Sequence, residues 1–275
     1  MYRLFGILLV CRIFLFSPEL FSQKINGNVL DSLQEQESGI DVKIFRGINN
    51  YRTSFLESVI PITDKSVLPA ALILPLGLGG IARYNNNYYD ENSAVLLALS
   101  EITSTALTSG IKYIVRRERP YATLKNVHVR KDNSPTDRYS FPSGHTAMAF
   151  SMATSLTLRY PDKPAVIAGS FLYAAIAGYG RVFLGVHYPS DVLGGMLVGS
   201  GSAAVIYAFR KDIIEFKNKL FNEEGRPDSN SSLSAGAILG LTAGADALNM
   251  LVGKIAGSNV NVYSDGYSLN AIVHF

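Results

Sequence analysis

Five apolar segments follow Lys65, and they restrict the fold of this chain more than any other feature of its sequence. They cover residues 66–82, 93–111, 146–158, 164–180 and 192–209, and the only charge within them is Glu101. Glycine, alanine and leucine are frequent, without the alternation of β-branched residues that is typical of strands, so we expect helices. The pattern predicts an all-α fold, a bundle of about five to six apolar helices.

The lengths of these segments leave two environments open. The three longest uncharged segments have 17, 17 and 18 residues, whereas about 20 residues are typical of a helix that crosses a bilayer. Basic residues favour a membrane, because Arg83, Arg159 and the cluster at 210–219 would share one side if the segments alternate across it. A soluble helical bundle is the alternative. Gly195 and Gly199 predict a close helix contact, which both kinds of bundle use.

The N-terminal segment, residues 1–23, has the order of features found in secretory signals. Arg3 precedes an apolar stretch at residues 4–16, and small or polar residues follow at 22–23. The segment is therefore expected to be a signal peptide or an N-terminal anchor, with a buried helix as the alternative. Cys11, the only cysteine of the chain, lies within it. Removal of the segment would leave no thiol for disulfides or cysteine chemistry.

The C-terminal tail, residues 228–275, begins within the polar linker "NEEGRPDSNSS" and differs in character from the apolar segments. Apolar residues alternate at its end, which is typical of a strand; they are Tyr267, Leu269, Ala271, Val273 and Phe275. An outer-membrane barrel needs at least about 8 strands, and the tail is too short for that. We therefore expect a β-hairpin, whose role the sequence leaves open.

The charge balance excludes one class of partner. The chain carries 25 basic and 22 acidic residues, a formal net charge of +3. No stripe of basic residues interleaved with aromatic ones is present in the sequence. We therefore expect no nucleic-acid partner.

The segment "KYIVRRERP" is the first of three that carry functional side chains. Lys112 and Arg119 are seven residues apart, which would place them on one face of a helix together with Arg116. Pro120 is expected to end that helix. The alternative for such a run is an ordinary solvated basic face.

The segment "SFPSGHTAMAF" places Pro142–His145 directly before an expected helix. A turn that leads into a helix offers unpaired N–H groups and the positive end of the helix dipole to an anion. Gly144 would let the backbone approach such a ligand closely. In the alternative interpretation this is an ordinary turn, with Ser143 as the helix cap.

The segment "GRVFLGVHYPSD" contains Arg181, His187 and Asp191. A carboxylate four residues from an imidazole can bond one ring nitrogen and leave the other nitrogen basic. The alternative is a buried structural histidine, with Asp191 as the cap of the next helix.

Together the three segments resemble the signature of the type 2 phosphatidic acid phosphatase (PAP2) family, which includes class A acid phosphatases and vanadium haloperoxidases. The resemblance covers about residues 66–209. It implies a PAP2-type helical domain over residues 24–220, and we expect a few short helices in residues 24–65. The sequence departs from the family at Gly180, where serine is usual. That departure would weaken one hydrogen bond near the phosphate without removing a catalytic group.

By this resemblance, His187 is the nucleophile that forms a phosphohistidine and Asp191 orients it. His145 would protonate the leaving alkoxide and then activate water. The groups expected to hold the phosphate are Lys112, Arg119, Ser143, Gly144 and Arg181. No metal or other cofactor is expected, and vanadate is expected to inhibit as a phosphate mimic.

The resemblance thus implies a metal-independent phosphatase that acts on phosphate monoesters or diphosphates, above all those of membrane lipids. Its expected place is the bacterial cell envelope, either in the inner membrane with the site facing the periplasm or in the periplasm itself. Three alternatives stay open: a soluble broad-specificity acid phosphatase, a vanadium-dependent haloperoxidase, and a non-catalytic envelope protein that binds phospholipid.

Overall fold

The computed structural model describes residues 39–129, 137–223, 226, 228, 260–264 and 269–273. The helices in these ranges are α3 (Ile40–Asn50), α4 (Ser54–Tyr84), α5 (Tyr88–Val115), α6 (Pro120–Thr123), α7 (Gly144–Arg159), α8 (Pro164–Phe183), α9 (Pro189–Ala208) and α10 (Arg210–Leu220). The all-α bundle predicted from the sequence is confirmed. Residues 1–23, the expected signal peptide or anchor, lie outside the described ranges.

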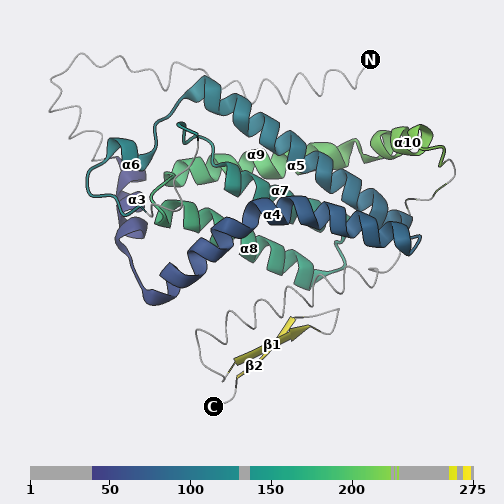
Figure 1. Cartoon of the computed structure of the whole chain (residues 1–275), viewed down its shortest axis with the longest axis horizontal. Coiled ribbons are helices and arrows are strands. Elements are labelled where there is room, and N and C mark those ends of the chain that lie inside the picture. The colour runs from purple at the N-terminus through teal and green to yellow at the C-terminus, as the bar shows by residue number, and fades with distance from the viewer. Residues whose placement is uncertain are drawn as a thin grey trace.

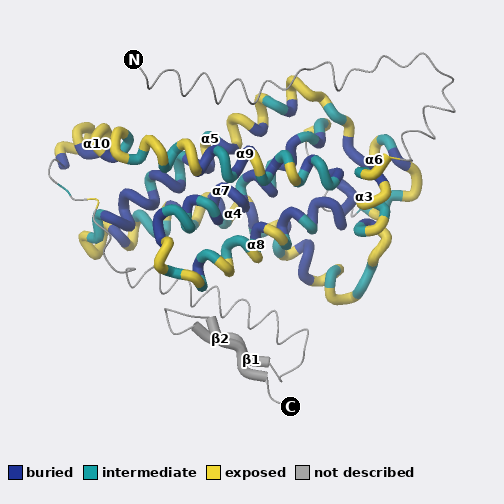
Figure 2. The backbone as a smooth tube through the Cα atoms, turned by 180° about the vertical axis from the view of Figure 1, so that it is seen from behind, coloured by how far each residue is buried: buried dark blue, intermediate teal, exposed yellow. Residues whose placement is uncertain are grey.

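The long helices run along the length of the bundle, with α3 and α6 at one end and α10 at the other (Figure 1). The central helix, α7, packs against α4, α5, α8 and α9. Its residues Ala149, Phe150 and Ala153 form the core with Leu97 of α5 and Ala177 of α8. Figure 2 shows the buried faces of the helices turned toward one another and the exposed residues on the outside.

The C-terminal tail contains two described strands, β1 (Val260–Ser264) and β2 (Leu269–Val273). They pair antiparallel, with Val260 opposite Val273 and Ser264 opposite Leu269. This pairing lies in the part of the sequence where a hairpin is expected.

Helix α4 begins much earlier than the apolar pattern predicts. The first apolar segment starts at residue 66, but the helix starts at Ser54. Thr53 caps this start, because its hydroxyl accepts the N–H of Leu56 at 3.2 Å. The polar residues of the first turns hid the helix from a search for apolar periodicity. The expectation of only short helices in residues 24–65 is therefore correct for α3 and wrong for α4.

Two glycines of α9 bring its backbone against the start of α7. A Cβ atom at Gly199 would lie 2.1 Å from the carbonyl oxygen of Ala147, and one at Gly195 would lie 2.6 Å from that of Ser143. No side chain fits between the two helices at these positions. The close helix contact predicted for this glycine pair is confirmed.

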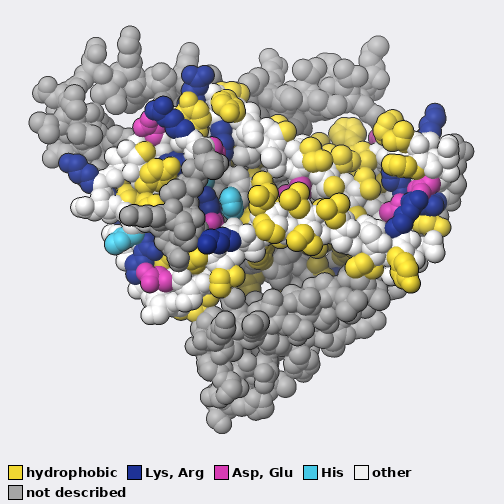
Figure 3. Space-filling model, viewed as in Figure 1, with side chains coloured by type: hydrophobic (Ala, Val, Ile, Leu, Met, Phe, Trp, Pro, Cys, Tyr) yellow, Lys and Arg dark blue, Asp and Glu magenta, His cyan; other side chains and the backbone are white. Residues whose placement is uncertain are grey.

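Four described helices, α4, α5, α8 and α9, are long and apolar enough to cross a membrane. Large apolar side chains project from their outer surfaces; Leu72 and Leu76 of α4 and Leu197 of α9 are 58%, 74% and 68% exposed. Figure 3 shows hydrophobic side chains covering much of one face. Such a surface fits lipid tails better than water.

Ion pairs lie at both ends of the bundle, and those at the α10 end include the basic residues expected to share one side. Arg83, at the end of α4, pairs with Glu91 at 2.9 Å, and Lys217 of α10 contacts the same carboxylate at 3.4 Å. Arg159, at the end of α7, pairs with Asp228 at 2.7 Å. Arg83 at the end of α4, Arg159 at the end of α7 and Lys217 of α10 thus lie on one side.

Glu101 is a buried acid in the middle of α5, and its side chain is unsatisfied. The residue is 7% exposed, and neither carboxylate oxygen forms a hydrogen bond within the described part of the chain. Replacing Glu101 by methionine, which has a similar length, is expected to stabilise the protein by about 1–3 kcal/mol, the usual cost of an unpaired buried polar group. Thermal unfolding in detergent measures this change. The control is Glu215→Met at an exposed site of α10, and a lower melting temperature for Glu101→Met would contradict the prediction.

Candidate active site

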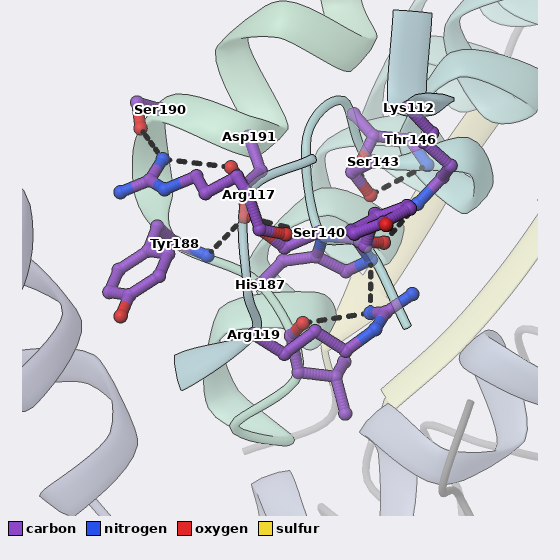
Figure 4. A network of polar contacts seen from close by, with 12 residues as sticks. Lys112, Arg117, Arg119, Ser140, Ser143, Thr146, His187, Tyr188, Ser190 and Asp191 are labelled. Atoms are coloured by element: carbon purple, nitrogen blue, oxygen red, sulfur yellow. Dashed lines mark hydrogen bonds and ion pairs between the residues drawn. The ribbon is translucent and has the colours of Figure 1, made fainter. Parts of the chain in front are cut away.

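The residues singled out from the three sequence segments lie at the α3 and α6 end of the bundle. Figure 4 shows five of them close together: Lys112, Arg119, Ser143, His187 and Asp191. Their positions are Lys112 near the end of α5, Arg119 before α6, Ser143, Gly144 and His145 at the start of α7, Arg181 in the last turn of α8, His187 before α9, and Asp191 in the first turn of α9. All except Gly144 and His145 are buried. Backbone contact between α7 and α9 holds two of these groups together, since the N–H of Ser143 donates to the carbonyl oxygen of Asp191 at 2.9 Å.

Lys112 and Arg119 do not share a helix face, contrary to the sequence prediction. Helix α5 ends at Val115 because Arg116 adopts a left-handed conformation with φ of 54°. Pro120 begins the short helix α6 and does not end α5. Arg116 bonds the carbonyl oxygen of Tyr113 at 2.9 Å and is exposed, so it does not join the site.

Asp137 brings Lys112 and Arg119 together. The ammonium group of Lys112 lies 2.9 Å from one carboxylate oxygen, and the guanidinium of Arg119 bonds the other. Partial burial would raise the pKa of Asp137, but hydrogen bonds from the two cations, together with their charges, hold that pKa below its ordinary value. The Asp137 side chain is 48% exposed and Arg119 only 2%. A carboxylate thus occupies the exposed side of a buried pair of cations.

Arg181 is the third cation, and Asp64 of α4 is its partner. The two side chains form a buried ion pair, with 5% and 8% of their side-chain surfaces exposed. The Nε atom of Arg181 has no hydrogen-bond partner among the described residues, so part of the guanidinium is free to bind an anion. Asp64 was missed in the sequence, because residue 64 precedes the first apolar segment and only the structure shows that it belongs to the long helix α4.

His187 lies between a cation and a carboxylate. Its Nε2 atom is 3.1 Å from Nη1 of Arg119, and its Nδ1 atom is 3.4 Å from Oδ2 of Asp191. Arginine can only donate, so Nε2 accepts and the proton of a neutral ring is on Nδ1. Burial lowers the pKa of His187 well below its ordinary value, and the charges of Arg181 and Arg119 lower it further. The ring therefore stays neutral, with a lone pair on Nε2.

His145 is partly buried at the start of α7. Burial and the charge of Arg181 lower its pKa to about 4. The imidazole is therefore neutral near pH 7 while no anion is bound. An anion among the cations would offset their charges and raise this pKa.

Ser143 is the N-cap of α7, as in the alternative interpretation, and Asp191 takes part in a capping box as the third residue of α9, whose N-cap is Tyr188. The hydroxyl of Ser143 accepts from the hydroxyl and N–H of Thr146, at 2.8 and 3.4 Å. The Asp191 carboxylate accepts the N–H of Tyr188 at 2.8 Å. Capping fixes both side chains at the site and does not exclude a second role.

Arg117 is a site residue that the sequence analysis missed. Its guanidinium donates to Asp191 at 2.8 Å and to Asp41 of α3 at 2.6 Å. Neighbouring arginines at 116 and 117 could not be told apart from the sequence, because the left-handed turn at Arg116 decides which of them faces inward.

Three cations around a neutral histidine, with a second histidine nearby, define a class of protein: a helical enzyme that handles a phosphoryl group. Comparison with known families agrees. Residues 93–215 match the PAP2 superfamily. This chain thus contains a PAP2 superfamily domain, and it is a phosphoric ester hydrolase.

Curated relatives of this chain include two kinds of phosphatase. The undecaprenyl-diphosphatase of Sulfolobus acidocaldarius is 28% identical over 166 residues, which are 60% of this chain and 76% of that protein. The non-specific acid phosphatase of Salmonella typhi is 29% identical over 160 residues, which are 54% of this chain and 63% of that protein.

A solved structure supports the fold. The crystal structure of Aquifex aeolicus LpxE is 28% identical and has a TM-score of 0.51. The similarity covers 62% of this chain and 96% of that one.

Proposed function

We propose that this enzyme releases phosphate from phosphorylated membrane lipids through a phosphohistidine at His187. One observation carries the proposal: the neutral Nε2 of His187 lies 3.1 Å from the guanidinium of Arg119, which is one of three buried cations at the end of a bundle with membrane-length helices. An anionic phosphoryl group bound by these cations would lie next to the nucleophile. The similarity to an undecaprenyl-diphosphatase supports a lipid substrate.

In the first half of the proposed reaction, Nε2 of His187 attacks phosphorus. The bond from phosphorus to the substrate alkoxide oxygen breaks, and protonated His145 gives its proton to that oxygen. Lys112, Arg119 and Arg181 neutralise the charge that spreads over the equatorial oxygens. The carboxylate of Asp191, which faces Nδ1–H of His187, stabilises the positive charge that develops on the ring.

In the second half, neutral His145 accepts a proton from water, and the resulting hydroxide attacks phosphorus. The phosphorus–nitrogen bond breaks, which frees inorganic phosphate and returns the electron pair to Nε2 of His187. His145 ends protonated, ready for the next alkoxide. Side chains supply all the charge in this scheme, so we propose that the enzyme needs no metal or other cofactor. We also propose that vanadate inhibits it as a mimic of phosphate.

The turn at Ser143 and Gly144 is proposed to complete the phosphate site. A Cβ atom at Gly144 would meet only Thr108, at an ordinary 3.7 Å. Packing within the protein therefore does not require glycine here, and close approach of a ligand gives a reason for it. We propose that the N–H groups at the start of α7 and the Ser143 hydroxyl contact phosphate oxygens.

We propose that the enzyme lies in the inner membrane of a bacterium with its site facing the periplasm. Arg83, Lys217 and Arg159 lie at the α10 end, close to the ends of the apolar helices, and the positive-inside rule would place such residues in the cytoplasm. The cations Lys112, Arg119 and Arg181 at the opposite end belong to the proposed phosphate site. The site lies at the other end of the same helices (Figure 1).

The test is phosphate release from phosphatidate, a polyprenyl diphosphate and p-nitrophenyl phosphate, with EDTA present and with protein extracted in detergent. Release from a lipid that resists EDTA is the expected result. Release from the aryl phosphate alone would favour an acid phosphatase, the activity of the Salmonella relative. Bromide oxidation by vanadate-loaded protein would favour a haloperoxidase, and no reaction at all would favour a protein that only binds phospholipid.

Asp137 is expected to compete with the substrate phosphate. In Asp137→Asn the cations Lys112 and Arg119 lose an anionic partner, so vanadate should bind about 5-fold more tightly, which is about 1 kcal/mol. Calorimetric titration with vanadate measures the change. The control is Glu118→Gln, which breaks the exposed pair with Arg138 beside the site. Weaker vanadate binding by Asp137→Asn would mean that Asp137 positions the cations and does not compete.

The pKa of His145 is expected to rise when a phosphate analogue binds. In the free protein the imidazole should titrate near pH 4. With vanadate or phosphate bound, the added negative charge favours the imidazolium, so titration should move to higher pH. NMR of histidine-labelled protein in detergent measures both values, with His145→Asn to assign the signal. Identical titration curves with and without the anion would contradict this expectation.

A further inference from the structure

Arg117 bridges two carboxylates, one from the catalytic segment and one from outside the region matched to the family. Its Nη1 atom donates to Oδ1 of Asp191 at 2.8 Å, and its Nη2 atom donates to Oδ2 of Asp41 at 2.6 Å. The guanidinium also lies over the Tyr188 ring, 3.9 Å from its centroid. These contacts hold the planar group in one orientation.

Asp41, on α3, is in turn fixed to the start of α9. Its Oδ1 atom accepts the N–H of Ser190 at 2.9 Å, and its Oδ2 atom accepts the hydroxyl of Ser190 at 2.6 Å. Ser190 lies in the first turn of α9, where backbone N–H groups have no partner within the helix. A carboxylate there is also favoured by the helix dipole. Asp41 therefore ties α3 to the turn that contains Asp191.

The contact between His187 and Asp191 depends on this support. The Nδ1 to Oδ2 distance is 3.4 Å, and Nδ1 has no hydrogen bond in the described part of the chain. Asp191 is fully buried, so its charge needs a cationic partner, and Arg117 supplies one. Figure 4 shows Arg117 reaching both Ser190 and Asp191, on the side of Asp191 away from Arg119.

From these contacts we infer that Asp41 and Arg117 are positioning residues for His187. They hold the Asp191 carboxylate where it keeps the proton of His187 on Nδ1 and the lone pair on Nε2. Helix α3, which precedes the matched residues 93–215, is therefore part of the catalytic unit. The inference rests on the proposed phosphohistidine mechanism for its effect on rate, but the contacts act on His187 whether or not a substrate is present.

The test is Asp41→Asn, which keeps one oxygen acceptor for Ser190 and removes the charge that faces Arg117. We expect phosphohistidine formation in a single turnover to slow by about 10- to 100-fold, because a displaced reacting group costs that much. Affinity for vanadate should not change, because Asp41 contacts none of the three phosphate-binding cations. Nitrogen-15 NMR should show part of the His187 population with its proton moved from Nδ1 to Nε2.

A matched control and a second variant make the result specific. Lys43→Gln changes a charge on the exposed side of α3 and should leave rate and tautomer at wild-type values. Arg117→Lys keeps the charge but cannot bond both carboxylates from one plane, so it should resemble Asp41→Asn.

Two results would overturn the inference. One is a wild-type tautomer of His187 in Asp41→Asn together with a wild-type rate. The other is a loss of rate that is matched by an equal loss of vanadate affinity and of melting temperature, which would mean a structural role only. If the wild-type protein forms no phosphohistidine, the proposed function fails, and the tautomer of His187 still decides whether Asp41 positions the ring.

Discussion

His187→Ala is expected to lower phosphate release by at least about 10³-fold, because it removes the proposed nucleophile of a two-step reaction. No other described histidine has both a carboxylate at Nδ1 and an arginine at Nε2. The loss should be the same for lipid and aryl phosphates, since both need the same attacking atom. Phosphate release measures the complete reaction. Transfer of radioactive phosphate from a labelled substrate to the protein, quenched in alkali, measures the first step.

The matched control for His187→Ala is His128→Ala. His128 is exposed, and its backbone, not its ring, contacts Asn49 and Arg52. Its removal should leave the rate and the labelling intact. If His187→Ala keeps full activity, or His128→Ala loses as much, His187 is not the nucleophile.

His145→Asn is expected to cost about 10²- to 10⁴-fold with a lipid substrate, the range for loss of a general acid. An alkoxide is a poor leaving group and needs the proton, whereas p-nitrophenolate leaves without one. The loss in the first step should therefore be much smaller with p-nitrophenyl phosphate. Hydrolysis of the phosphohistidine still needs His145 as a base, so this variant should release a burst of p-nitrophenol and accumulate phosphorylated protein.

The comparison of two substrates on one variant provides the control for this prediction. A folding defect would lower both rates by the same factor and would produce no burst. Equal losses for the lipid and the aryl phosphate would therefore contradict the assignment of His145 as acid and base.

The fold was largely predictable because apolar periodicity dominates it. All five apolar segments lie in helices, and the Gly195–Gly199 contact followed from their spacing. The start of α4 was not predictable in this way, because Glu57, Asp64 and Lys65 interrupt the apolar pattern of its first turns. The turn after Val115 could not be predicted either, since no reliable sequence signal shows that the backbone of Arg116 adopts the left-handed conformation.

The site was predictable only where its residues belong to short motifs. His145, His187 and Arg181 stand in such motifs, and the fold brings them to one end of the bundle. Their supporting carboxylates come from distant parts of the chain; Asp41 lies 149 residues from Ser190, and Asp64 lies 117 residues from Arg181. Such pairs depend on helix packing, which single-sequence patterns do not reveal. Asp41, Asp64 and Arg117 were therefore visible only in three dimensions.

The glycine contact between α7 and α9 fixes the spacing of two parts of the candidate site. The start of α7, which carries His145, and the start of α9, which follows His187, are spaced by two touching backbones. Mutation of ordinary side chains cannot readily alter that spacing. Exposed residues such as Asp137 and Tyr121 are not part of this backbone contact. Substitutions away from this contact can therefore change the surroundings of the site without changing the spacing of the two turns that carry His145 and His187.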